Sequence, residues 1–290
     1  MTDIACVVDC KNKLGEVPVW DVDEEALYWV DIENKLLQRY APATAEARRW
    51  TLPERIGSFA LRRRGGLVCA LASGFAFFDP VSGRIDWIDK PEAGIARNRF
   101  NDGKCDRKGR FWAGTMDDRL EEHTGALYRL DTDLTVHRLV GSIGISNSLA
   151  WSPDNRRFYF ADTMDRAIYL FDYEHETGAI SNKRLFASTE GDAGVPDGST
   201  IDADGFLWNA QWGGWRLVRY APDGGVDRVV PLPVQNPTSC MFGGPDLRTL
   251  YVTSAVWDLD DDALRKQPWA GGVLTLDPGV AGLPEPRFAG

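Results

Sequence analysis

Four polar side chains precede similar apolar segments at almost the same offset, 10 or 11 residues before each segment begins: Glu16, Asn101, Asn147 and Asp197. Two carboxylates and two amide oxygens gathered at close range resist burial unless a cation or a set of hydrogen-bond donors compensates them. Oxygen ligands of this kind favour Ca²⁺, Mg²⁺ or Mn²⁺, although ligand type alone does not exclude Zn²⁺ or Fe²⁺. A fold that brings the four side chains together would therefore form a site for one divalent metal cation.

The apolar segments themselves form a repeat, and they begin at residues 27, 67, 111, 158, 207 and 250. The separation between them suits the roughly 40 to 50 residues of a four-stranded propeller blade. Short alternating runs bounded by Pro, Asp and Gly favour antiparallel strands, and no segment keeps a strong helical period. The sequence predicts an all-β, six-bladed β-propeller with four antiparallel strands per blade, almost no helix, and residues 1–290 as a single domain.

A ring of blades would bring the four polar side chains together. The innermost strand of each blade starts near one mouth of the axial channel, so side chains at a shared offset should point into a common funnel. The two remaining blades offer Ile56 and Ser239 at this offset, which leaves the funnel open on those sides. Asn and Asp also occur as simple turn residues. Turn residues need no shared register, however, so the repeated offset favours contact with a metal or a substrate.

Composition excludes several other functions. A net charge of −10 and an isoelectric point near 4.9 oppose binding to nucleic acid. No run of eighteen apolar residues and no secretory signal occurs, so we expect no membrane partner and a cytoplasmic location. The five cysteines are an odd set without a CxxC pair and should be free thiols. No Gly-x-Ser-x-Gly elbow accompanies the three histidines, which disfavours a Ser-His-Asp hydrolase. No feature of the sequence indicates an oligomeric state.

Five segments of the chain resemble one known family, the SMP-30/gluconolactonase/regucalcin-like lactonases, and the resemblance covers essentially the whole chain. They are residues 14–20, 98–104, 145–152, 196–199 and 242–245. Members of this family are six-bladed propellers that hydrolyse sugar lactones with a divalent cation. The resemblance implies that Glu16, Asn147 and Asp197 coordinate the metal, and that Arg99, Asn101 and Asp102 face the ligand or its bound waters. This chain departs at Ser148, where the family usually has Gly, and in the loop 116–124, whose length varies.

Lactone opening suits a site of this kind, because the carbonyl must accept water and pass through a tetrahedral oxyanion. A cation would polarise the carbonyl and activate the water, and Asp197 would serve as the base or would orient the water. Arg99 and Asn101 are two residues apart in an extended segment, so both should face the funnel and could bind sugar hydroxyls. Glu121 is a further candidate for hydroxyl binding.

Trp212 and Trp215 are candidates for stacking on the sugar. The expected small-molecule partner is thus a sugar lactone, hydrolysed to the aldonic acid. Two alternatives remain open at this point. A calcium-binding regulatory protein would share the metal ligands but would not need the group of Arg99, Asn101 and Asp102. A metal-dependent esterase or phosphotriesterase would use the same cation on another substrate.

Overall fold

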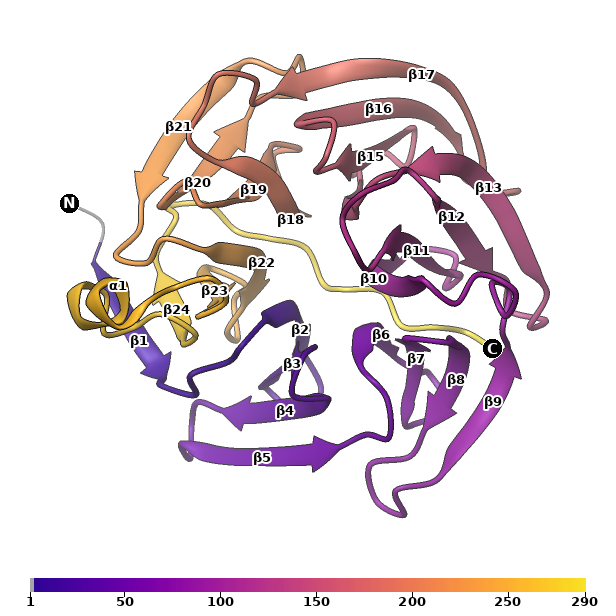
Figure 1. Ribbon diagram of the computed structural model, residues 1–290, viewed down its shortest axis with the longest axis horizontal. Coiled ribbons are helices and arrows are strands. Elements are labelled where there is room, and N and C mark those ends of the chain that lie inside the picture. Colours follow the sequence, from indigo (N-terminus) through magenta and orange to yellow (C-terminus); the bar gives the residue numbers. More distant parts are fainter. Residues whose placement is uncertain (1–2) are drawn as a thin grey trace.

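Six four-stranded antiparallel sheets stand around a central axis in a computed structural model that describes residues 3–290 (Figure 1). The predicted six-bladed β-propeller is confirmed. Blades 1 to 3 contain β2 (Gly15–Asp21), β3 (Ala26–Asp31), β4 (Leu36–Ala41) and β5 (Glu46–Thr51); β6 (Ile56–Leu61), β7 (Leu67–Leu71), β8 (Gly74–Phe78) and β9 (Ile85–Asp89); and β10 (Asn98–Cys105), β11 (Phe111–Asp117), β12 (Gly125–Leu130) and β13 (Val136–Ile143).

Blades 4 to 6 complete the ring, and their strands are as follows. They contain β14 (Ser146–Trp151), β15 (Arg157–Asp162), β16 (Ala167–Glu174) and β17 (Ala179–Ser188); β18 (Val195–Ile201), β19 (Leu207–Trp212), β20 (Arg216–Tyr220) and β21 (Val226–Pro231); and β22 (Pro237–Gly243), β23 (Thr249–Ser254), β24 (Val273–Leu276) and β1 (Ile4–Val8). The repeated apolar segments of the sequence lie on the second strand of each blade, and the shared polar positions lie on the first.

Blade 6 closes the ring because it takes strands from both ends of the chain. β1 pairs antiparallel with β24, with Ile4 opposite Leu276. The six first strands contact one another in cyclic order around the axis, from β2 through β6, β10, β14, β18 and β22 back to β2. Residues near both ends of the chain therefore hold the inner strands in one closed circle.

Large aromatic side chains fill the spaces between blades. Trp112 and Trp208 occupy equivalent places on β11 and β19, Trp29 lies one position further along β3, and all three are almost completely buried. The indole N–H of Trp112 donates to Asp106 at 2.9 Å, and that of Trp208 donates to Asp202 at 2.9 Å. A buried indole needs such an acceptor, so the turn that precedes each of these two strands is tied to the core.

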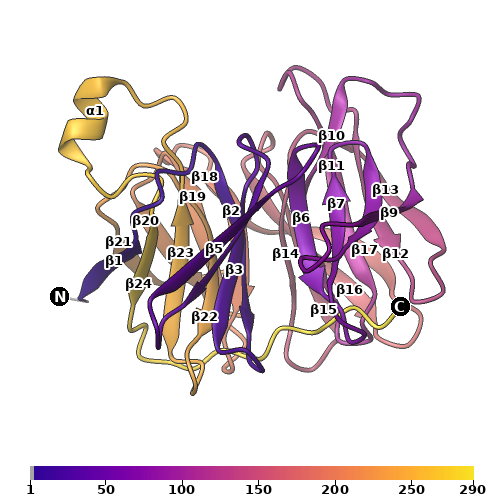
Figure 2. The same cartoon turned by 90° about the horizontal axis from the view of Figure 1, so that it is seen from below.

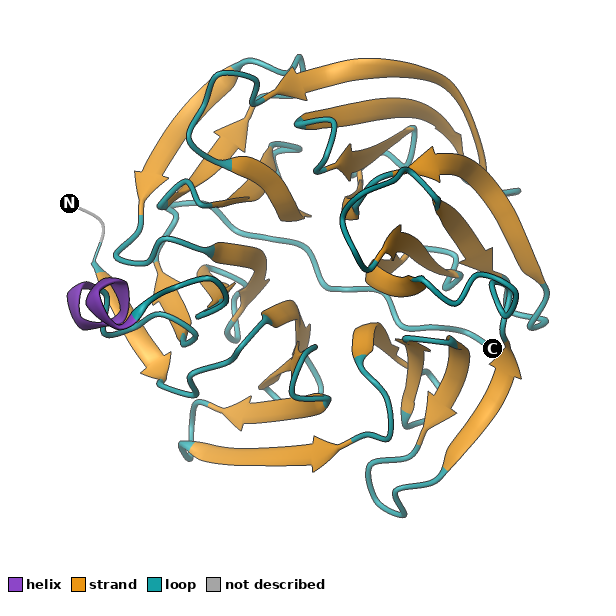
Figure 3. Cartoon of the chain, in the orientation of Figure 1, coloured by secondary structure: helices purple, strands orange, loops and turns teal. Residues whose placement is uncertain are grey.

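The two faces of the ring differ (Figure 2). In the described part of the chain the only helix is α1 (Asp261–Lys266), which lies on one face beyond β23 and is capped by the Asp260 carboxylate (Figure 3). The last residues of the chain cross the opposite face, where Phe288 is fully buried and pairs with the backbone of Leu61 and Arg63. Within residues 3–290, no helix has the length and apolar character needed to span a membrane.

Candidate active site

A cavity of about 230 Å³ opens at the axis on the α1 face. Its wall contains side chains from several blades and from the loops above them: Leu14, Glu16, Arg99, Asn101, Met116, Leu120, Ile145, Asn147, Thr163, Val195, Asp197, Trp212, Trp257 and Asp258. All four polar side chains at the shared offset are in this set. The structure thus brings together residues that are far apart along the chain.

A β-bulge lies at the corresponding place in every blade. The register between the first and second strands shifts just after Glu16, Asn147 and Pro196, and across Asn101 and Asp102. The same shift occurs in blades 2 and 6. A bulge bends its strand and redirects a side chain, which explains how four of these strands turn Glu16, Asn101, Asn147 and Asp197 into the axial cavity.

Backbone strain accompanies two of these bulges. Val17 and Ser148 adopt positive φ angles of 47° and 62°, and each directly follows a polar side chain of the cavity. This region suits glycine and costs a β-branched residue such as valine on the order of 1–3 kcal/mol. The Ser148 hydroxyl donates to the carbonyl oxygen of Asp197 at 2.5 Å. The serine that stands in place of the family's usual glycine therefore links the bulge of blade 4 to that of blade 5.

Two buried carboxyl groups, Glu16 and Asp197, line the cavity, and a third, Asp102, is buried close to them. Burial is the largest cause that raises the pKa of Glu16, and the charge of Asp102 raises it further. Burial and the charges of Glu16 and Asp102 raise the pKa of Asp197 well above its usual range. Glu16 and Asp197 are close enough to hydrogen-bond, which requires a shared proton when no cation is bound. Among residues 3–290 neither group forms an ion pair, and the charge of Arg99 lowers the pKa of Glu16 only as the smallest of the causes.

Hydrogen bonds at both ends fix the orientation of the Asn147 amide, which lines the cavity. Its nitrogen donates to the Thr163 hydroxyl at 2.8 Å, and that hydroxyl donates to the carbonyl oxygen of Pro196 at 2.7 Å. Its oxygen accepts from the amide nitrogen of Asn101 at 3.1 Å. The hydroxyl of Thr163 thus fixes which end of the Asn147 amide carries the nitrogen and leaves the oxygen beside Asn101, although nothing in the sequence pattern marks Thr163.

The structure separates the predicted substrate-binding residues into three places. Arg99 and Asn101 line the cavity, and an N–H of Arg99 donates to the Asn101 oxygen at 2.7 Å. Asp102 is buried outside the cavity wall, where its carboxylate accepts from the Gly103 N–H at 2.8 Å. Glu121 is not among the lining residues: its side chain is 63% exposed and lies 3.3 Å from Arg97.

Aromatic side chains form part of the wall. Trp212 lines the cavity, whereas Trp215 is exposed and lies outside it. Trp257 also lines the cavity, from the loop that leads to α1. Sequence reasoning did not single out Trp257, because this loop is not part of the blade repeat.

Comparison with known proteins identifies the family. Residues 14–256 match the family model described as the SMP-30/Gluconolactonase/LRE-like region. The chain belongs to this family. It is similar to L-arabinolactonase of Azospirillum brasilense, with 42% identity over 98% of the chain and 95% of that protein. It is also similar to 6-deoxy-6-sulfogluconolactonase of Pseudomonas putida, with 37% identity over 99% of each.

The solved structure of the calcium-binding protein regucalcin from Agrobacterium tumefaciens also resembles the chain, with 30% identity, a TM-score of 0.95, and coverage of 99% of this chain and 97% of that one. The resemblance drawn from the sequence motifs is therefore confirmed. The similarity of this member of the SMP-30/gluconolactonase family to that structure extends over all six blades, including the blade that contains strands from both ends of the chain.

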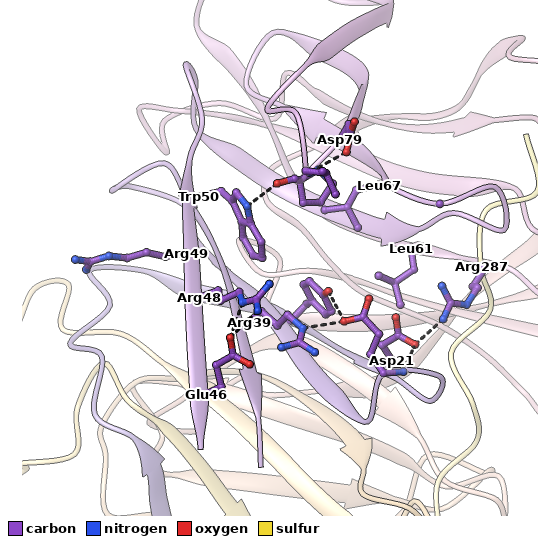
Figure 4. A pocket seen from close by; sticks show the side chains of 16 residues that line it. Asp21, Arg39, Glu46, Arg48, Arg49, Trp50, Leu61, Leu67, Asp79 and Arg287 are labelled. Carbon is purple, nitrogen blue, oxygen red and sulfur yellow. Dashed lines mark hydrogen bonds and ion pairs between the residues drawn. The ribbon is translucent and has the colours of Figure 1, made fainter. Parts of the chain in front are cut away.

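A larger groove of about 750 Å³ lies between blades 1 and 2, outside the ring axis (Figure 4). Its charged side chains largely satisfy one another: Arg39 pairs with Glu24 at 2.8 Å, and Arg287 pairs with Asp21 at 2.5 Å. It contains none of the residues singled out by the family motifs. The smaller axial cavity is therefore the candidate active site of this family member.

A second group of possible metal ligands, His123, Asp162 and Asp165, has ligand atoms within 4.8 Å of one another. Hydrogen bonds already account for its carboxylates. Asp162 accepts from the backbone N–H groups of Gly144 and Ile145 at 2.8 and 3.0 Å, and Asp165 accepts from the Tyr169 hydroxyl at 2.9 Å. Because these hydrogen bonds already satisfy the two carboxylates, we assign no metal to this group.

Proposed function

We propose that this protein hydrolyses a sugar lactone to the aldonic acid at the axial cavity, with the aid of one divalent cation. The observation that carries the proposal is the meeting of Glu16 and Asp197, from blades 1 and 5, as buried carboxyl groups that no ion pair within residues 3–290 neutralises. Such an arrangement is costly unless a cation completes it.

The donor set suits a hard divalent cation. Glu16, Asp197 and Asn147 supply carboxylate and amide oxygens, the ligands that Ca²⁺, Mg²⁺ and Mn²⁺ prefer, and no thiol or imidazole lines the cavity. The similarity to a protein described as calcium-binding regucalcin supports the same assignment. When bound, a divalent cation supplies Lewis-acid chemistry, polarising a carbonyl and lowering the pKa of a water by several units.

The residues of the chain divide the remaining work. We infer that the oxygen of a water molecule attacks the lactone carbonyl carbon, and that Asp197 takes a proton from this water or orients it. The bond from that carbon to the ring oxygen then breaks, and the proton passes to the ring oxygen to give a hydroxyl. Arg99 and Asn101 bind the sugar hydroxyls, and the apolar side chains of Leu14, Val195 and Trp212 exclude bulk water.

The names of similar proteins support a lactone as the substrate class, because two of them are lactonases of sugar acids. A calcium-binding protein without catalysis would need no Arg99 and Asn101 beside its ligands, so their presence in the wall favours an enzyme. An esterase or phosphotriesterase would share the cation but would gain little from a wall that offers several hydroxyl-binding groups.

The test is a panel assay. Protein stripped of metal is mixed with γ- and δ-lactones of pentonic and hexonic acids, simple esters and a phosphotriester, with each divalent cation added back separately. We expect acid release from at least one sugar lactone, only with an added cation, and with a kcat/KM well above that for the esters. Equal rates with and without every cation, or no turnover of any lactone, would refute the proposal.

A further inference from the structure

We propose that Arg55 is a positioning residue, which holds Asp118 so that Asp118 in turn holds Arg99 ready for the sugar. Neither the blade repeat nor the family motifs point to Arg55 or to Asp118. The proposal rests on the proposed function, because it assigns Arg99 to substrate binding, but its geometric part can be tested without turnover.

Arg55 and Asp118 form a two-pronged ion pair between blades. Arg55 lies just before β6 of blade 2, and its two terminal nitrogens donate to the two carboxylate oxygens of Asp118 at 2.9 and 2.6 Å. Asp118 follows β11 of blade 3. Arg55 also donates to Glu33 of blade 1 at 3.0 Å. A bidentate pair of this kind fixes orientation as well as distance, so Arg55 ties the loop after β11 to two other blades.

Asp118, held by Arg55, in turn holds the guanidinium of Arg99. Its Oδ1 accepts from the Nε of Arg99 at 3.1 Å. The Nη1 of Arg99 donates to the carbonyl oxygen of Phe100 at 3.0 Å and to the amide oxygen of Asn101 at 2.7 Å. These contacts occupy three of the five N–H bonds of the guanidinium. Within residues 3–290 Nη2 has no partner, so its two N–H bonds are left for a ligand.

Packing alone does not hold Arg99 in place. Arg99 lines the axial cavity on one side and, together with Asp118 and Arg55, an open depression of about 740 Å³ between blades 2 and 3 on the other. With space on both sides, the direction of its guanidinium depends on its polar partners. Burial and the nearby charge of Arg55 lower the pKa of Arg99, and Asp118 between the two arginines opposes that effect.

The contacts form one continuous path from the edge of the ring to the metal-binding residues. The path runs through Glu33, Arg55, Asp118, Arg99, Asn101 and Asn147, and no step exceeds 3.1 Å. Arg55 acts through one intermediate, Asp118, before it reaches the substrate-binding group Arg99. Its loss should therefore weaken the binding of the sugar more than it slows the chemical step.

The kinetic test compares Arg55→Met with Arg39→Met. Arg39 forms a similar ion pair with Glu24 but borders only the outer groove. We expect Arg55→Met to raise KM for the lactone at least tenfold with kcat within threefold of wild type, and Arg39→Met to change KM less than twofold. Arg55→Lys keeps the charge without the fork, and we expect an intermediate KM. Equal effects of Arg55→Met and Arg39→Met, or a loss confined to kcat, would overturn the proposal.

A double variant checks the route of the effect. If Arg55 acts through Asp118, then Arg55→Met combined with Asp118→Asn should raise KM no more than twofold above Asp118→Asn alone. Multiplication of the two single effects would contradict the assigned order. Should Arg55→Met fail to fold, as judged by its thermal melt, Arg55→Lys takes its place in both comparisons.

A spectroscopic test separates this inference from the proposed function. In protein with ¹⁵N-labelled arginine, the Nε–H signal of Arg99, assigned by its loss in Arg99→Lys, should exchange slowly with water in the wild type because Asp118 accepts its hydrogen. It should exchange at least tenfold faster in Arg55→Met and remain unchanged in Arg39→Met. If the wild type turns over no lactone, the proposed function fails while this signal still decides the role of Arg55; unchanged exchange in Arg55→Met would reject it.

Discussion

Replacing Glu16 by glutamine should make the metal-free protein more stable and at the same time abolish most of its response to a divalent cation. Glutamine keeps the shape of the side chain and removes its charge. Without a cation, burial raises the pKa of Glu16, Asp102 and Asp197; the charge of Asp102 raises that of Glu16 further, and the charges of Glu16 and Asp102 raise that of Asp197 further. Removing one of them relieves that repulsion, which is the usual way in which a functional site costs stability.

The size of the effect follows from the length of the chain. An unfolding entropy of about 2.1 cal/mol/K per residue gives about 0.6 kcal/mol/K for 290 residues. A gain of about 2 kcal/mol then raises the melting temperature of the metal-free variant by about 3 °C. A cation at a hundred times its Kd stabilises the wild type by about 2.7 kcal/mol, or about 4 °C. If the variant binds about a hundredfold more weakly, its shift falls to about 1 °C.

The pH dependence has a definite sign. A carboxyl group whose pKa is raised in the folded state stabilises the fold below its unfolded pKa of about 4.3, and this stabilisation is lost as the pH rises. The metal-free wild type should therefore lose stability between pH 5 and pH 8, and Glu16→Gln should lose less. The cation should restore more stability to the wild type at pH 8 than at pH 6, because it replaces bound protons.

The assay is a set of thermal melts at pH 6 and pH 8, with chelator and with Ca²⁺. Glu285→Gln is the matched control: Glu285 is also buried, and burial raises its pKa, but it lies beside Lys104 on the opposite face. It should keep the full response to Ca²⁺. A metal-free Glu16→Gln that melts below the metal-free wild type would refute the account of the three carboxyl groups.

Two further predictions concern activity and one concerns stability. Asp197→Asn should lower kcat by about 10²–10⁴-fold, the usual contribution of a general base, and a rate within fivefold of wild type with cation bound would exclude that role. Arg99→Ala should raise KM about 10–100-fold in steady-state kinetics, because charged hydrogen bonds to the substrate are lost. Glu121→Ala should change KM less than twofold, because Glu121 lies outside the cavity. A larger effect of Glu121→Ala than of Arg99→Ala would contradict the placement of both residues. Ser148→Gly removes a strained φ angle, which gains about 1 kcal/mol, and three buried hydrogen bonds of the hydroxyl, with Asp197, Ser199 and Asn209, which cost about 1 kcal/mol each. Chemical denaturation should therefore show a net loss of about 2 kcal/mol, and an unchanged or higher stability would mean that the backbone strain outweighs these contacts.

Much of the fold can be predicted from the sequence because each blade repeat is local in the chain. Closure of the ring depends on residues far apart in the chain and could not be predicted in this way. Each apolar segment and the polar residue before it lie within one blade, so their spacing predicts both the blades and the meeting of Glu16, Asn147 and Asp197. The pairing of β1 with β24 joins residues about 270 positions apart and leaves no local pattern.

Loops explain why Asp118 rather than Glu121 approaches Arg99. The carboxylate of Asp117 accepts from the backbone N–H groups of Arg119, Glu121 and Glu122, and this turns the loop after β11 so that Glu121 faces solvent. A capping contact of this kind depends on the three-dimensional course of the chain. Spacing along the sequence could identify the loop but not which of its acidic residues would point inward.

The last residues of the chain give the ring a closed bottom, since the segment that contains Phe288 spans the face opposite α1. The axial cavity of the propeller is therefore open on the α1 face and covered on the opposite face. A reactant must then enter, and its product must leave, through the same opening. Accumulated product should therefore compete directly with the incoming molecule for the cavity that Trp257 helps to line.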